Sequence, residues 1–156
     1  MKHRAYGGLR IAKNFVLSVV IVLSACAPAS AEIKLPDIKY NRDVCDSCGM
    51  IISDPKFAAA TLMTNGETRK FDDIGDMVAY HAQHPELQVK AWFVHDYPTQ
   101  AWIRAEDAFF VVSREKLITP MGRGVAAFSA QSTAEAFAKN LGVKVLTFEE
   151  LKKEIR

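Results

Sequence analysis

The architecture of the chain follows from one segment, FAAATLMTNGETRKFDD, which spans residues 57–73. Its first part is apolar apart from a single threonine, a pattern typical of a buried strand. The pair Asn65-Gly66 then predicts a tight hairpin turn, because both residues adopt the positive φ angles that such turns need. Asp72 and Asp73 end the segment, and a carboxylate there can cap a helix by accepting hydrogen bonds from free backbone N–H groups. We therefore expect two antiparallel strands that lead into a helix.

The residues that follow predict a repeated unit of strands and helices. Apolar side chains recur at helical spacing from Ile74 to Val78, and His84-Pro85 ends this helix because the residue before proline avoids helical angles. Phe71 in the first half corresponds to Phe128 in the second. The expected strands are 57–63, a short strand ending at Phe71, and 88–94, 100–104, 108–112, 125–128 and 143–148. The expected helices are one that follows Asp73 and stops at His84-Pro85, and those at 133–140 and 149–156. We predict an α+β fold of two similar ββαβ units packed together, the alternative being a single α+β domain whose halves are alike by chance.

The N-terminal region predicts export and lipidation. Basic residues without any acidic one precede an apolar run at 15–23, which is typical of a cleaved signal peptide and short for a membrane span. The motif Leu23-Ser24-Ala25-Cys26 resembles the bacterial lipobox, in which the cysteine is acylated and becomes the first residue. An ordinary signal peptide with a coincidental cysteine is the alternative. The predicted organisation is a lipoprotein signal peptide at 1–25, a lipidated N-terminus and tether at 26–39, and structural units at 40–98 and 99–156.

Composition narrows the classes of function. The chain has 156 residues, of which 49% are hydrophobic and 24% are charged, which is enough apolar material for a folded core and excludes a disordered chain. Beyond the signal peptide, 16 basic and 18 acidic residues remain. No cluster of lysine and arginine stands out among them, so nucleic acid is not an expected partner.

The segment Cys45-Asp46-Ser47-Cys48-Gly49-Met50 carries the richest chemistry. Outside the cytoplasm the two cysteines could form a disulfide or a redox-active pair, which would make the chain a thiol-disulfide oxidoreductase. They could also form half of a zinc site, but once Cys26 is lipidated the chain lacks the thiols for a four-sulfur site. The thioether of Met50 favours a third interpretation, because neutral soft sulfur suits Cu(I). Met121, between a proline and two nearby glycines, is a second methionine of this kind, although methionine more often fills a core.

Four ordered blocks together are similar to a known family. They are Cys45-x-x-Cys48-Gly49-Met50, residues 71–77, residues 92–97 and residues 119–128. Behind a lipobox, they resemble the NosL family of copper-binding lipoproteins that accompany bacterial nitrous-oxide reductase. The resemblance covers about residues 40–150 and implies a paired ββαβ fold, similar also to the organomercurial lyase MerB. Carbon–mercury cleavage would rest on that likeness of fold alone, which is weak support for a function.

The resemblance also implies a function and a set of site residues. The chain would be a Cu(I)-binding metallochaperone of denitrification and not an enzyme, delivering copper for assembly of the copper centres of nitrous-oxide reductase. Its partners would be the reductase, the associated membrane transporter and, through the lipid, the periplasmic side of a membrane. Ala27 gives no retention signal of the Asp type, which favours the outer membrane. The implied metal ligands are Cys48, Met50, Met121 and His95, and the residues that could support them or hold a second ion are Asp73, Asp96 and Cys45.

Overall fold

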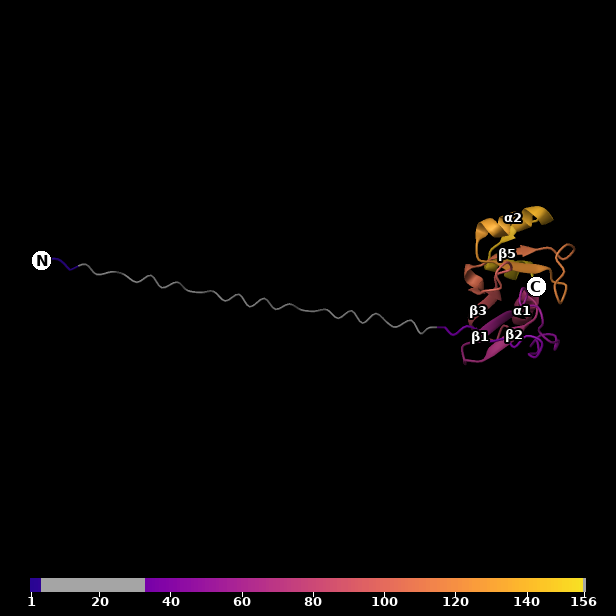
Figure 1. Ribbon diagram of the computed structural model, residues 1–156. Coiled ribbons are helices and arrows are strands. Elements are labelled where there is room, and N and C mark those ends of the chain that lie inside the picture. The colour runs from indigo at the N-terminus through magenta and orange to yellow at the C-terminus, as the bar shows by residue number, and fades with distance from the viewer. Residues whose placement is uncertain (4–32, 156) are drawn as a thin grey trace. The chain divides into compact units, whose positions relative to one another are not determined.

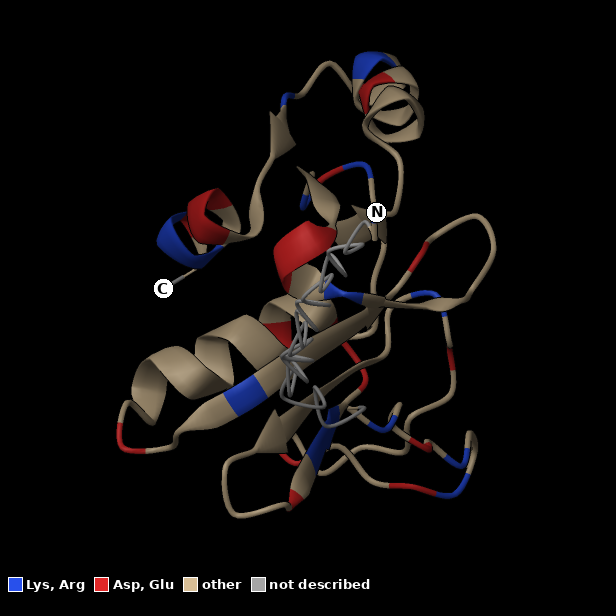
Figure 2. Cartoon of the chain, turned by 90° about the vertical axis from the view of Figure 1, so that its left-hand side faces the viewer, with Lys and Arg blue, Asp and Glu red and all other residues tan. Residues whose placement is uncertain are grey.

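Two antiparallel sheets, each accompanied by a helix, form the body of the protein (Figure 1). The computed structural model describes residues 1–3 and 33–155. The predicted signal peptide, Cys26 and part of the predicted tether lie outside the described residues. Acidic and basic residues are interspersed along the described chain, in keeping with its balanced charge (Figure 2).

The first sheet grows from the hairpin predicted at 57–73. Strands β1 (Ala59–Met63) and β2 (Thr68–Phe71) are joined by a turn in which Gly66 has a φ of 90°. Helix α1 (Ile74–Gln83) follows at once, and β3 (Val89–His95) returns antiparallel to β1. A short strand, β4 (Trp102–Arg104), completes the order β2-β1-β3-β4.

The second sheet repeats the order β2-β1-β3 of the first sheet. A 3-10 helix, η1 (Ala105–Asp107), leads into β5 (Phe109–Val112), which pairs with β6 (Val125–Phe128) and with β7 (Val145–Leu146) on its other side. Helix α2 (Gln131–Leu141) connects β6 to β7, and α3 (Phe148–Glu154) follows β7. In each sheet the first strand is central, and Phe71 and Phe128 lie opposite the first residues of β1 and β5. The predicted α+β fold of two ββαβ units is confirmed.

Three details of the prediction were wrong. The strand expected to open the second unit at 100–104 pairs with β3 instead, because Gln100 takes a left-handed φ of 58° and turns the chain back on the first sheet. Helix α2 starts at Gln131, before the expected start at residue 133, and its N-cap Ala130 makes no side-chain hydrogen bond. Strand β7 is shorter than expected because Thr147 already caps α3, its side chain accepting from the N–H of Glu150.

The core brings the two units into one body. Its larger cluster combines Met77 of α1, Phe110 of β5 and Leu151 of α3, and all three side chains are buried. A second cluster lies under α2, between that helix and the second sheet. Because β6 begins after the loop 113–124, this packing brings that loop to the N-terminal end of α1. Among the described residues, no helix has the length and apolar character needed to cross a membrane.

Candidate metal site

The two cysteines lie on a small loop that backbone hydrogen bonds close. The N–H of Cys45 donates to the carbonyl of Met50 at 2.8 Å, and the N–H of Gly49 donates to the carbonyl of Cys45 at 3.0 Å. Gly49 has a φ of 75°, a left-handed angle that glycine adopts without steric cost. Asp46 fixes the loop to β2, since its carboxylate accepts from the N–H of Lys70 at 2.7 Å. The loop therefore lies beside the junction between β2 and α1.

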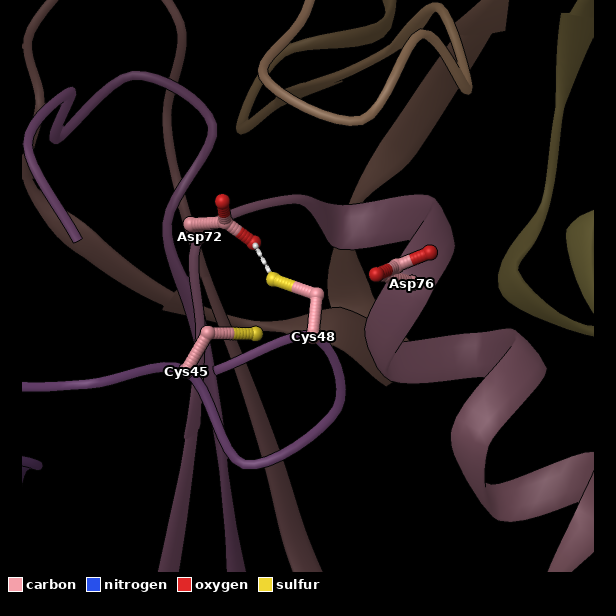
Figure 3. A group of neighbouring side chains, drawn as sticks. All are labelled: Cys45, Cys48, Asp72 and Asp76. Atoms are coloured by element: carbon pink, nitrogen blue, oxygen red, sulfur yellow. Dashed lines mark hydrogen bonds between the residues drawn. The ribbon is translucent and has the colours of Figure 1, made fainter. Parts of the chain in front are cut away.

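Four potential ligand side chains meet at this junction. A sulfur of Cys45, a sulfur of Cys48, and one carboxylate oxygen each of Asp72 and Asp76 all lie within 4.8 Å of one another (Figure 3). The thiol of Cys48 donates to Oδ1 of Asp72 at 3.6 Å, and the two cysteines are not joined by a disulfide. Cys45, Asp72 and Asp76 are buried, whereas Cys48 is partly exposed. An ion held here would be shielded on one side and approachable on the side of Cys48.

Burial and ion pairing both set the charge of the groups in this cluster. Burial raises the pKa of the Cys45 thiol to about 12, while backbone N–H groups of Cys48, Asp72 and Ser47 act against that shift. The thiol is therefore protonated at neutral pH, and a metal that binds its sulfur must displace a proton. Of the two carboxylates in the cluster, that of Asp76 forms an ion pair, since the Nε of Arg123 lies 3.0 Å from its Oδ1.

The two candidate thioether ligands lie on exposed loops. Met50 follows the cysteine loop with its side chain about 51% exposed. Met121 is partly exposed, and its backbone N–H donates to Oδ2 of Asp73 at 3.1 Å. Asp73 is also the N-cap of α1, so the loop of Met121 is fixed to the helix that carries Asp76. Neither methionine fills the core, and their role as ligands stays a prediction.

His95 and Asp96 form hydrogen bonds with residues outside the cluster of cysteines and aspartates. Nδ1 of His95 lies 2.7 Å from the carbonyl oxygen of Gln100, which can only accept, so Nδ1 carries the proton. Nε2 then accepts from the hydroxyl of Tyr40 at 2.7 Å. Burial lowers the pKa of His95 and keeps the imidazole neutral. Asp96 accepts from Thr99 and from the N–H of Ser129, and it thereby shapes the turn after β3.

Comparison with known proteins identifies the family. The NosL family model matches residues 38–156. This chain belongs to the NosL family. The copper-binding lipoprotein NosL of Stutzerimonas stutzeri is 29% identical over 121 residues, a match that covers 72% of this chain and 63% of that protein. This chain thus spans less than two thirds of that relative's length. The crystal structure of the copper chaperone NosL from Shewanella denitrificans superposes with a TM-score of 0.63 and 27% identity, over 75% of this chain and 94% of the other.

Two acidic residues in the NosL blocks were not predicted as part of the site. Asp72 was expected to be a helix cap, and no role was predicted for Asp76. Asp72 precedes the N-cap Asp73, whereas Asp76 lies in the first turn of α1, so helical spacing does not pair them. Their proximity to the cysteines was not visible in the sequence, because the contact between Cys48 and Asp72 spans 24 residues.

Proposed function

We propose that this chain is a periplasmic lipoprotein that binds Cu(I) and delivers it during assembly of the copper centres of nitrous-oxide reductase. The observation that carries this proposal is the partly exposed thiol of Cys48, whose sulfur lies within 4.8 Å of ligand atoms of the buried Cys45 and Asp72. Met50, two residues further along the chain, is exposed. Soft sulfur donors of this kind prefer Cu(I) to hard cations. The names of both relatives, a copper-binding lipoprotein and a copper chaperone, support copper as the cargo.

The proposed ligands are the thiolate of Cys48 and the thioethers of Met50 and Met121, with Cys45 as a second sulfur. One thiolate balances the charge of a monovalent ion, and neutral thioethers add bonds that an incoming ligand can replace. Such a site can shield copper and still release it, which is a carrier's role and not a catalyst's. His95 could join only by exchanging the hydroxyl of Tyr40 for the metal, so its role as a ligand stays a prediction.

The partners follow from the proposed cargo. A reductase or its associated membrane transporter would approach the exposed side of Cys48 and take the ion by ligand exchange. The lipid on Cys26 would hold the chain at the periplasmic face of a membrane, with the outer membrane favoured. Two acyl chains supply ample anchoring energy, at about 0.8 kcal/mol per buried methylene.

A competition titration tests copper binding. The reduced mature protein, titrated with Cu(I) in the presence of a coloured Cu(I) chelator, should take one ion per chain. Cys48→Ser should lose most of that affinity, whereas Ser47→Ala on the same loop should keep it. A Cys48→Ser protein that competes for Cu(I) as well as the unsubstituted protein would rule out this site.

Delivery needs a separate experiment. Copper-loaded protein mixed with copper-free nitrous-oxide reductase should transfer its copper and raise the reductase activity, and Cys48→Ser loaded with the same total copper should not. Equal maturation by both proteins, or by free Cu(I) at the same concentration, would leave the protein a copper binder without this delivery role.

The oxidoreductase alternative has one observation in its favour, namely two unbridged cysteine sulfurs within 4.8 Å. Catalytic thiols of that class have lowered pKa values, whereas burial raises the pKa of Cys45 to about 12. Insulin reduction that disappears in Cys45→Ser would favour this alternative over copper transport.

A further inference from the structure

We propose that Asp73 is a positioning residue of the candidate metal site, whose buried carboxylate holds the loop of Met121 against the start of α1, the helix that carries Asp76 of the cluster. This inference rests on the proposed function, because it concerns how Met121 becomes available to copper. Asp73 lies between the two aspartates of the cluster in sequence, but it does not share their contacts with the cysteines.

The two oxygens of Asp73 serve two different segments. Oδ1 accepts from the N–H of Gly75 at 2.8 Å and so caps α1. Oδ2 accepts from the hydroxyl of Thr119 and from the N–H of Met121, at 2.5 and 3.1 Å. The side chain has no exposed surface. Asp73 therefore joins the helix start and the Met121 loop. Because both of its oxygens already accept hydrogen bonds, Asp73 affects a bound ion through Met121 and not as a ligand.

The loop that Asp73 holds is built around Thr119. The N–H of Gly124 donates to the hydroxyl oxygen of Thr119, and the N–H of Gly122 donates to its carbonyl oxygen, both at 3.0 Å. Gly122 and Gly124 have left-handed φ angles of 67° and 66°. Because Thr119 both closes the loop and donates to Asp73, loss of the carboxylate would release the loop as a unit.

A second pair of contacts fixes the same loop against the same helix turn. Arg123 packs so closely on Gly75 that a Cβ there would lie 2.4 Å from the Cβ of Arg123. The guanidinium of Arg123 also pairs with Asp76, a member of the cluster. The loop thus contacts the start of α1 at three neighbouring positions. Met121, which carries a donor sulfur, lies between the two residues that hold the loop, Thr119 and Arg123.

Asp73→Asn separates the two roles of Asp73, which are the cap of α1 and the hydrogen bonds to Thr119 and Met121. Asparagine caps a helix about as well as aspartate, so its oxygen can keep the bond to Gly75. Its amide nitrogen cannot accept from the N–H of Met121. In wild-type protein labelled with 13C at the methionine methyl groups, one equivalent of Cu(I) should shift the signals of Met50 and Met121. In Asp73→Asn only Met50 should shift, and Cu(I) affinity should fall roughly 10- to 100-fold, as for other supports of metal ligands.

Three further variants make the outcome decisive. Met121→Leu should lose the same affinity, and combining it with Asp73→Asn should cause no further loss, since both remove one ligand. Thr119→Val should act like Asp73→Asn, and it replaces that variant if Asp73→Asn does not fold. Thr147→Ala removes the cap of α3 and is the control for general destabilisation. It should keep both methyl shifts.

The possible failures are distinguishable. If wild-type protein binds no Cu(I), the proposed function is wrong and this inference falls with it. If wild-type protein binds Cu(I) while the folded Asp73→Asn protein keeps its affinity and the Met121 shift, or if the losses from Asp73→Asn and Met121→Leu add, the positioning role alone is overturned.

Discussion

Gly75 lies in the first turn of α1, where alanine is ordinarily more favourable than glycine by about 1 kcal/mol. In this protein the missing side chain has a packing reason, since a Cβ would lie 2.4 Å from the Cβ of Arg123. The loop cannot withdraw without breaking its bonds to Asp73. We therefore expect Gly75→Ala to lower the free energy of unfolding by about 1–3 kcal/mol, as overpacking does elsewhere.

Urea unfolding measures this change directly. Adding Arg123→Gly to Gly75→Ala should recover part of the loss, because the two nearest atoms to the new Cβ belong to Arg123. A Gly75→Ala protein as stable as the unsubstituted one would mean that the loop moves freely at this point.

A second residue-scale prediction concerns Tyr40 and His95. Tyr40→Phe removes the donor to Nε2 of His95, so this nitrogen would be free to bind copper. If His95 were already a ligand, removing its competitor should strengthen Cu(I) binding. We expect this increase in affinity, together with a loss of about 1 kcal/mol of stability in the copper-free protein through the lost hydrogen bond. The chelator competition used above measures the affinity, and an increase would identify His95 as a ligand.

The contacts of the neighbouring residues Asp72 and Asp73 differ in how far the sequence could predict them. The cap formed by Asp73 is a local interaction with Gly75, two residues away, so the predicted helix start was enough to suggest it. The contact of Asp72 with Cys48 and that of Asp73 with Met121 join distant parts of the chain, 24 and 48 residues apart. Such contacts depend on packing between elements, and no local pattern encodes them.

At the scale of the element, α2 and α3 begin in contrasting ways. Thr147 and Glu150 form a capping box at α3, whereas Ala130 at the start of α2 offers no side-chain hydrogen bond. Ala130 is exposed, so a serine there meets no packing constraint. Ala130→Ser should raise the free energy of unfolding by about 0.5–2 kcal/mol, the usual worth of a cap. A thermal melt measures the gain, Thr147→Ala gives the opposite change for comparison, and an unchanged melting temperature for Ala130→Ser would contradict the prediction.

Strand β4 marks the limit of element prediction. Its alternating residues indicated a strand correctly, but they could not indicate the strand's partner. The turn back to β3 needs a left-handed φ at Gln100, and glutamine gives no sequence signal for that angle. The repeat of two units therefore suggested the wrong sheet for a strand that was itself predicted.

At the scale of the whole molecule, the strand orders β2-β1-β3 and β6-β5-β7 are the same. Each follows from an antiparallel strand pair and a helical return within one unit, and such orders are predictable because sequential elements usually lie next to each other. The packing of the units on one another is not of this kind. It places the loop 113–124 beside α1, where Arg123 pairs with Asp76 of the candidate site. Such a contact between units has no local sequence signal, which explains why the fold was easier to predict than the candidate site.

Buried histidines make the stability of the whole domain depend on pH. Burial lowers the pKa of His81 to about 4, with the nearby charges of His84 and Arg69 adding to the effect, and burial also lowers the pKa of His95. In the unfolded chain both have ordinary values near 6.5. Between these values the unfolded state binds more protons than the folded state, so the free energy of unfolding must fall as the pH is lowered through 6.5.

We expect this acid destabilisation to reach a slope of up to about 1.4 kcal/mol per pH unit for His81, and to level off for this residue below pH about 4. Urea unfolding from pH 7.5 to about 4 measures the slope. His81→Gln keeps a polar group near Thr61, the hydrogen-bond partner of Nε2, and removes the titration, so its slope should be smaller. Asp73 acts in the opposite direction, because burial raises its pKa and the folded state then takes up its proton first. If the free energy of unfolding of His81→Gln falls with pH as steeply as that of the unsubstituted protein, the imidazole of His81 makes no measurable contribution and other groups cause the effect.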